Sequence, residues 1–235
     1  MSPKQGDERR QALHSGMRRR KPDATFDAIT RDERKQRTRR GLMDAALQLL
    51  AGERSFSSLS LREVAKVGGV VPAAFYRHFS GMDDLGLALV DDAFHTLHDL
   101  MREARTAPLP SSNLIANSVE TFLHYVQAHR LQFLFLAKER VSGSSVVRLA
   151  IRKEVRLWVS ELAADLAVIP RLKRLSAEDL RMVTALVVQC VMGATELMLD
   201  ADPEDEEALA QIQRQAGKQI MLIFLGASQW KSREA

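Results

Sequence analysis

The segment PAAFYRHF at 72–79 contains side chains whose types suit the reading of DNA base pairs. Alanine methyl groups can contact the methyl group of thymine, and an arginine guanidinium can donate two hydrogen bonds to O6 and N7 of guanine. On a helical wheel, Ala73, Ala74 and Arg77 fall on one side of this segment. The pattern predicts a small, basic outer face that enters the major groove.

The opposite side of the segment is apolar and is expected to pack inward. It holds Phe75 and Phe79 together with Val71 and Pro72. Tyr76 falls at the flank, where its hydroxyl can donate to a phosphate. His78 leans towards the packed side, and core packing and a contact with the DNA backbone are both open for it.

Contacts with DNA phosphates are also expected from the preceding helices. The first amides of a helix that follows Ser60 suit phosphate binding, because they point outward where the helix dipole is positive. The side chains expected near phosphates are Arg39, Arg40, Ser60, Arg62 and Lys66. A solvated surface is the alternative for any one of them. Their occurrence together beside a tight turn favours DNA.

Two capping boxes and a glycine pair define the helices that position these residues. The sequences TRDE and SLRE, which begin at Thr30 and Ser60, predict helix starts, the first for a helix over 31–51. The second helix is short and ends at the glycine pair 68–69, because glycine adopts a positive φ at little cost. A proline then begins a third helix over 72–79. Two short helices joined by such a turn predict a helix-turn-helix.

The rest of the chain also shows helical periodicity and no strand alternation. Ser80 with Asp83 is predicted to begin a fourth helix. Further helices are expected over 111–129, around LQFLFLA before Ser142, and over 145–168, 176–199 and 202–230. The chain is therefore predicted to be all-α, with about nine helices: an N-terminal three-helix domain and a larger helical domain after it.

Charge divides the chain in the same way. The net charge is +4, but residues 1–80 hold 17 Lys and Arg against 9 Asp and Glu, a net +8, and residues 81–235 hold 17 against 21, a net −4. A basic end on an acidic body is typical of a polyanion partner, with a merely solvated basic terminus as the alternative. We expect a flexible basic arm at 1–29, a DNA-binding domain at 30–80 and a sensing and dimerisation domain at 81–235.

A cytoplasmic protein without a membrane partner is expected. The longest apolar stretch is interrupted by Gln189 and Glu196, so it falls short of the roughly 18 residues of a membrane span. The basic clusters near the start have no apolar stretch behind them, which argues against a secretory signal. The single cysteine, Cys190, lies among valines and cannot form an internal disulfide.

Neither catalysis nor a cofactor is predicted. The sequence contains no G-x-S-x-G elbow, P-loop or G-x-G-x-x-G motif, so no catalytic residue is assigned. Asp91, His95 and His98 share helical spacing, but no matching ligand elsewhere supports a metal site. We expect His98 to make a hydrogen bond within the core instead.

Three segments of this chain resemble the DNA-binding domain of TetR-type transcriptional repressors: RRGLMDAALQLL, LSLREVAKVGGVVPAAFYRHF and DDLGLAL. The resemblance covers about residues 37–90. It implies that the first three helices bind DNA and that a larger helical domain binds an effector and dimerises. The chain departs from the family at Met82 and Asp83, where a lysine commonly contacts a phosphate.

A more specific resemblance rests on ERSFSSLSLREVA, FYRHF, MDDLGLALVDDA and LAKERVSGSSVVRLAIRKEVRLWVSELAADL. These segments are similar to the TetR-type repressors of unsaturated fatty acid synthesis or desaturase genes. That subgroup responds to long-chain acyl thioesters, so the resemblance implies long-chain acyl-CoA or acyl-carrier-protein as effector. The expected lining of the effector site comprises Phe94, Leu97, Phe122, Val126, Phe133, Trp158 and Leu162, with Arg140 and Arg148 at the mouth; ordinary core and surface are the alternatives.

A homodimer on a palindromic, double-stranded operator is expected, because one helix-turn-helix reads few base pairs. The apolar residues of the last two helices provide the expected interface, although an intramolecular core explains the same periodicity. They are Leu180, Val183, Val187, Val191, Ala194 and Met198, with Ile212, Gln219, Ile220, Ile223 and Phe224 facing them. Two other functions stay open: a lipid or small-molecule carrier with the same fold, and an architectural DNA-binding protein without an effector.

Overall fold

The computed structural model describes residues 30–51, 54–106 and 111–232, and within these ranges every regular element is helical. The all-α prediction is confirmed. The elements are α1 (Arg31–Leu49), the 3-10 turn η1 (Phe56–Ser58), α2 (Leu61–Val67), α3 (Pro72–Phe75), α4 (Met82–Thr106), α5 (Ser111–Ala128), α6 (Arg130–Ser142), α7 (Ser145–Ala167), α8 (Ala177–Asp200) and α9 (Glu206–Gln229). The expected arm at 1–29 lies outside the described residues.

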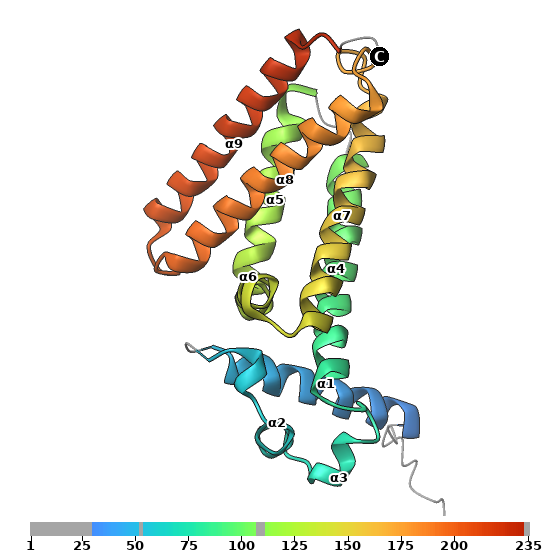
Figure 1. Cartoon of the computed structure of the whole chain (residues 1–235). Coiled ribbons are helices and arrows are strands. Elements are labelled where there is room, and N and C mark those ends of the chain that lie inside the picture. Colours follow the sequence, from blue (N-terminus) through green and yellow to red (C-terminus); the bar gives the residue numbers. More distant parts are fainter. Residues whose placement is uncertain (1–29, 52–53, 107–110, 233–235) are drawn as a thin grey trace, which may run out of the picture.

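The helices α1, α2 and α3 form a small unit at one end of the molecule, and α4 leads from it into the larger bundle (Figure 1). Both predicted capping boxes are present, so Thr30 and Ser60 begin α1 and α2 as expected. The second helix ends at Gly68, and Gly69 adopts a φ of 68°. Because a side chain disfavours that φ, the glycine pair sets the turn between α2 and α3.

The third helix is shorter than predicted. It is α-helical only over Pro72–Phe75, and a turn follows it. Val71 and Pro72 were expected on the packed side, but both are exposed, Val71 by 68%. Val71 is the N-cap, with an extended backbone at φ −73° and ψ 148°, so a helical wheel does not give the direction of its side chain.

Two predicted helix starts need correction. The Ser80 amide donates to Asp84 at 2.8 Å rather than to Asp83, whose carboxylate accepts from the Ser144 hydroxyl at 2.9 Å. The last helix begins at Glu206 with Asp205 as its cap, later than expected. The reason is a local turn, in which Asp202 accepts a hydrogen bond from the amide two residues on.

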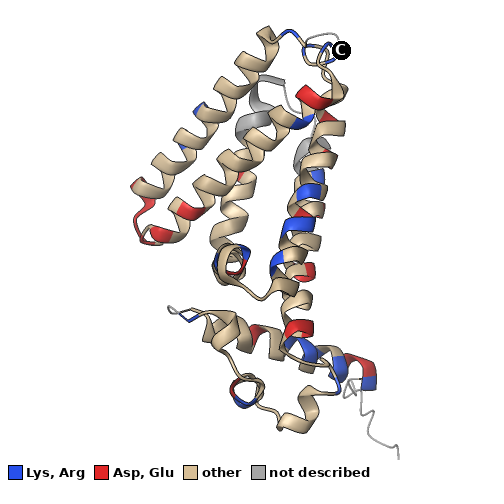
Figure 2. Cartoon of the chain, viewed as in Figure 1, with Lys and Arg blue, Asp and Glu red and all other residues tan. Residues whose placement is uncertain are grey.

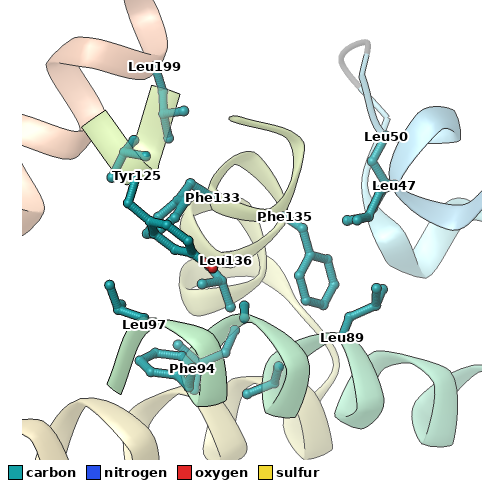
Figure 3. Packing of buried hydrophobic residues seen from close by; sticks show 14 of the residues in the cluster. Leu47, Leu50, Leu89, Phe94, Leu97, Tyr125, Phe133, Phe135, Leu136 and Leu199 are labelled. Atoms are coloured by element: carbon teal, nitrogen blue, oxygen red, sulfur yellow. The ribbon is translucent and has the colours of Figure 1, made fainter. Parts of the chain in front are cut away.

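One large hydrophobic core joins the small unit to the bundle. Leu47 and Leu50 of the small unit lie close to Phe135 and Leu89 of the bundle (Figure 3). Phe94, Leu97, Phe133 and Leu136 continue the same core further into the bundle. The position of the small unit is therefore set partly by packing against α4 and α6.

The helices α8 and α9 form an antiparallel pair along one side of the bundle (Figure 1). The stripes predicted for a dimer interface instead face the interior: Leu180, Val183, Val187, Ala194, Met198 and Ile220 are buried, and Val191, Ile212, Ile223 and Phe224 are half-buried. These residues belong to the core, the alternative that their periodicity left open, whereas Gln219 of the predicted set is exposed. Contrary to the sequence prediction, α8 is long and apolar enough to span a membrane, but it packs against α7 and α9 as a helix of the core.

Candidate nucleic-acid interface and effector region

The two phenylalanines predicted for the inner face of the segment 72–79 are buried, and most of the residues predicted for its outer face are exposed. Phe75 and Phe79 are 0% and 1% exposed, and their ring centroids lie 5.5 Å apart. Ala73, Tyr76 and Arg77 are exposed, whereas Ala74 is half-buried. A small basic surface is thus held outward by two buried aromatic anchors, which is the arrangement that a groove-entering helix requires. Contact of these residues with DNA stays a prediction.

Arg39 connects α1 to the end of α3. Its Nη1 donates to the backbone oxygen of His78 at 2.8 Å, and its Cζ lies 4.3 Å from the centroid of the Phe79 ring. The side chain is half-buried in this position. The guanidinium therefore fixes the segment 72–79, called the reading segment below, against α1. A contact with phosphate would come in addition to this role.

His78 packs beside the same arginine and is half-buried. Burial lowers the pKa of its imidazole below the usual 6.5, and the positive charges of Lys35, Arg39 and Arg77 lower it further. Its Nδ1 is buried without a hydrogen-bond partner in the described chain. These observations favour the packed alternative for His78.

Arg40 was expected to contact phosphate, but it is bound to the bundle. Its Nη1 lies 2.5 Å from Asp92 of α4, and its Nε lies 3.5 Å from Asp44. Asp92 also accepts a hydrogen bond from Gln132 of α6 at 2.9 Å. Arg40 thus joins α1 to α4 and, through Asp92, to α6.

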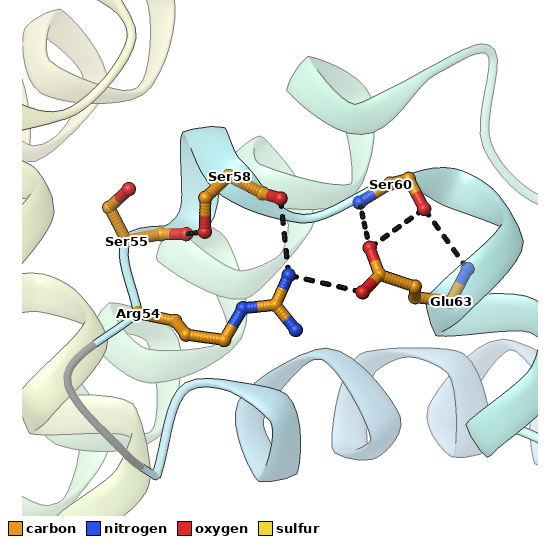
Figure 4. A network of polar contacts seen from close by, with 5 residues as sticks. All are labelled: Arg54, Ser55, Ser58, Ser60 and Glu63. Carbon is orange, nitrogen blue, oxygen red and sulfur yellow. Dashed lines mark hydrogen bonds and ion pairs between the residues drawn. The ribbon is translucent and has the colours of Figure 1, made fainter.

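The start of α2 is occupied by a polar network (Figure 4). The Ser60 hydroxyl donates to Glu63 at 2.8 Å, while Arg54 donates to Glu63 at 3.1 Å and to the Ser58 carbonyl at 3.2 Å. The hydrogen bond from the Ser60 amide is the main cause that lowers the pKa of Glu63. The Glu63 carboxylate already supplies negative charge at the start of α2. It therefore weakens the attraction of the predicted site for a phosphate. Arg62 and Lys66 are exposed and remain candidates for phosphate contacts.

Two helices carry a series of basic residues (Figure 2). Lys and Arg lie along α1 and form a second series along α7. An open hollow of about 720 Å³ runs between α1 and the turn after α2. It is lined by Gln36, Arg37, Thr38, Arg40, Gly41, Asp44, Gly68 and Val70. Sequence reasoning missed it, because its two walls come from segments far apart in the chain.

The predicted effector-lining residues come together in the bundle. Phe94, Leu97, Phe122, Val126 and Phe133 are buried, and Trp158 and Leu162 are half-buried against the same core. The Phe122 ring lies 5.9 Å from Phe133 and 5.7 Å from Trp158. The 720 Å³ hollow and a second hollow of about 230 Å³ between α7 and α8 are lined by other residues. An acyl chain at the predicted site therefore requires this aromatic cluster to separate.

The two cations expected at the mouth bind elsewhere. Arg140 lies 2.5 Å from Glu196 of α8, and Arg148 donates to the Gly143 carbonyl at 2.9 Å. Neither contact involves the aromatic cluster. An acyl thioester that used them would have to replace these bonds.

His98 lies beside the cluster, but its hydrogen bond runs to an exposed carboxylate rather than within the core as expected. Its Nδ1 is 3.1 Å from Glu161, and its Nε2 is 3.9 Å from Glu154, both on α7. The indole Nε1 of Trp158, on the same helix, is buried without a partner in the described chain. His95 is exposed and pairs with Asp99, and the described residues contain no cluster suited to a metal.

An apolar surface on α8 and α9 was missed by the sequence prediction. It comprises Met182, Leu186, Leu197, Met221, Leu222 and Leu225, which are all exposed. A Cβ added at Gly193 or Gly217 would meet no atom within 4 Å. Exposed large apolar residues on two neighbouring helices are typical of an interface. Both sides of these helices are apolar, so the sequence alone did not distinguish inner from outer face.

Two family models match the chain. The model described as bacterial regulatory proteins, tetR family, matches residues 42–89. The model described as tetracyclin repressor-like, C-terminal domain, matches residues 111–221. The first match contains the α2 and α3 segments and the second runs from α5 into α9. Together they cover more than half of the chain.

Solved structures show the same fold. A transcriptional regulator FadR from Bacillus subtilis, in complex with stearoyl-CoA, is 14% identical, with a TM-score of 0.65 over 78% of this chain and 96% of that one. The fatty acid degradation regulator FadR from Bacillus halodurans is 15% identical, with a TM-score of 0.61 over 77% and 94%. A TetR-family regulator from Streptomyces coelicolor is 19% identical, with a TM-score of 0.64 over 83% and 97%.

Proposed function

The chain belongs to the tetR family of bacterial regulatory proteins, and from this membership we propose that it represses fatty acid genes in response to long-chain acyl thioesters. Members of this family are DNA-binding transcriptional regulators and not enzymes. The target genes proposed are those of unsaturated fatty acid synthesis or desaturation. The regulator acts in the cytoplasm and has no membrane partner.

The surface at the end of α3 is the observation that carries DNA recognition. Phe75 and Phe79 fix this segment in the core, while Arg77 and Ala73 remain exposed. Arg77 donates to a guanine edge in the major groove, and Ala73 contacts a thymine methyl group. Lys66 and Arg62 contact phosphates that set the register of the helix-turn-helix.

The operator is a palindromic duplex bound by a homodimer. The exposed apolar residues of α8 and α9, including Leu186 and Leu222, form the contact between the two protomers. Pairing of two helices from each protomer buries these side chains in a four-helix bundle. Two-fold symmetry then presents two copies of α3 to the two half-sites of the operator.

The effector is a long-chain acyl-CoA or acyl-carrier-protein. Three observations support it: the sequence resemblance to regulators of unsaturated fatty acid genes, the aromatic cluster around Phe122 and Trp158, and the stearoyl-CoA bound to a regulator with this fold. Burial of an alkyl chain contributes about 0.8 kcal/mol per methylene, which is enough to separate a packed cluster. The acyl chain inserts between α4, α5 and α7, where these rings lie.

A gel-shift titration tests both halves of this function. Promoter fragments of fatty acid genes are titrated with the purified protein, and palmitoyl-CoA, oleoyl-CoA or free coenzyme A is added separately. We expect a specific shift that an acyl-CoA changes and free coenzyme A does not. An effector-independent shift would favour the architectural DNA-binding protein. Acyl-CoA binding without any specific shift would favour the lipid carrier.

A further inference from the structure

One face of α6 carries two buried polar side chains towards the DNA-binding end. Gln132 and Glu139 are seven residues apart, or about two helical turns, so they share one side of the helix. Both are buried, with 7% and 1% exposed. Phe135 lies between them and meets the ring of Phe56 edge-on, with a centroid distance of 5.4 Å. The helix therefore contacts the small unit through Phe135 and Glu139, while Gln132 contacts α4.

The contact at Glu139 joins the bundle to the small unit of α1, α2 and α3, which is the proposed DNA-binding unit. Its Oε1 accepts a hydrogen bond from the backbone amide of Phe56 at 3.0 Å. Its Oε2 is buried and has no hydrogen-bond partner in the described chain. Phe56 begins η1, the turn between α1 and α2. A buried carboxyl group with one bonded oxygen depends strongly on that single amide.

Close packing around Glu139 leaves little room for partial displacement. A Cβ added at Gly143 would lie 2.5 Å from both the backbone oxygen and Oε2 of Glu139. A Cβ added at Gly86 of α4 would lie 2.6 Å from Val147 and 3.0 Å from the Phe56 ring. The Glu139 carboxyl group and the Phe56 ring are therefore both tightly enclosed by their neighbours.

The turn η1 is tied to the first helix of the helix-turn-helix. Arg54 donates to the carbonyl of Ser58 and to Glu63, and Glu63 completes the cap at Ser60 (Figure 4). A displacement of Phe56 thus changes the position of the start of α2. The polar network links a side chain of the bundle to the element that places α3.

At the other end of α6, a second link runs through α4. Gln132 donates to Asp92, which holds Arg40 of α1. Since both links leave the same face of α6, the helix is attached to the DNA-binding unit at two points. Loss of the bond at Glu139 leaves the unit held by the second link and by the hydrophobic core, but removes the constraint on η1.

We infer that Glu139 is a positioning residue for DNA binding, which holds the helix-turn-helix at its reading angle through the Phe56 amide. Movement of α6 on effector binding breaks this bond. The α2 and α3 helices of the two protomers then no longer match the spacing of the operator half-sites. The inference rests on the proposed function, because it requires an operator and an effector that moves α6. Contiguity alone does not demonstrate coupling, so the test measures coupling directly.

The experiment compares Glu139→Asp, Glu139→Gln and the control Glu120→Asp, which changes an exposed carboxylate of α5. Aspartate withdraws the acceptor from the Phe56 amide, whereas glutamine retains an oxygen at the same reach. Deuterium exchange of 54–67 and operator affinity are measured, the affinity with and without palmitoyl-CoA or oleoyl-CoA. For Glu139→Asp we expect at least tenfold faster exchange, at least tenfold weaker operator binding and a reduced acyl-CoA effect. Glutamine should restore most of each property, and the control should match wild type.

Wild-type operator binding together with wild-type exchange in Glu139→Asp would overturn the inference. So would faster exchange with unchanged operator affinity and acyl-CoA response, because the bond would then be only structural. A wild-type protein that binds no promoter fragment would instead reject the proposed function. If Glu139→Asp does not fold, Gly143→Ala displaces the carboxyl group together with the backbone at Glu139, and the same three readouts decide.

Discussion

The guanidinium of Arg39 lies over the ring of Phe79, 4.3 Å from its centroid, while its Nη1 bonds to the adjacent backbone at His78. This arrangement makes Arg39 a clamp between α1 and the reading segment. Arg39→Ala should lower the free energy of unfolding by about 1–3 kcal/mol, from the lost charged hydrogen bond and cation–π contact. Urea unfolding measures it. A purely phosphate-binding arginine would leave that free energy unchanged and only reduce the salt dependence of DNA binding.

Arg77 and Lys66 should affect DNA binding in different ways. Both are exposed, but Arg77 lies on the reading segment and Lys66 lies on α2. Arg77→Ala should weaken operator binding by about 1–3 kcal/mol and relax preference at one base pair. Lys66→Ala should weaken binding to all sequences and lower the salt slope by about 0.9. Fluorescence anisotropy at several salt concentrations with operator and random duplexes separates the two.

The dimer depends on the outer faces of α8 and α9. Leu186→Glu or Leu222→Glu places a charge in the proposed interface, so each variant should remain folded and elute with the mass of a monomer. Light scattering after size-exclusion chromatography gives that mass. Leu149→Glu is the matched control, because Leu149 is equally exposed but lies on α7. A dimeric Leu222→Glu would place the interface elsewhere.

His78 should make stability depend on pH. Its pKa is lowered in the folded protein by burial and by Lys35, Arg39 and Arg77, so the unfolded chain binds the proton more readily. The stabilisation is present above the usual value of 6.5 and is lost as the pH falls through the folded pKa. Unfolding measured between about pH 7 and 5.5 should show a steeper decrease for wild type than for His78→Gln. Parallel pH profiles would exclude this role.

Gly86 should not tolerate a side chain. A Cβ there would approach Val147 and the Phe56 ring, so Gly86→Ala should cost about 1–3 kcal/mol of stability despite the better helix propensity. Gly41→Ala is the matched control in α1, where a Cβ meets no atom within 4 Å. It should stabilise the protein by up to about 1 kcal/mol. Thermal unfolding of both variants measures the contrast.

Local signals in the sequence determined the helices and the reading face. The capping boxes at Thr30 and Ser60, the turn at Gly69 and the alternation of Phe75 and Phe79 with exposed neighbours all act within a few residues. Such signals depend on backbone geometry and on the helical period, which do not require knowledge of distant segments. The all-α fold and the outward direction of Arg77 followed from them.

Only the tertiary structure decided which apolar and charged residues meet. Arg39 bonds to a residue 39 positions away, and Glu139 bonds to one 83 positions away. The sequence also left open which side of α8 and α9 is core, because both sides are apolar. These outcomes depend on how whole helices pack, and packing brings together side chains whose separation along the chain carries no periodic signal.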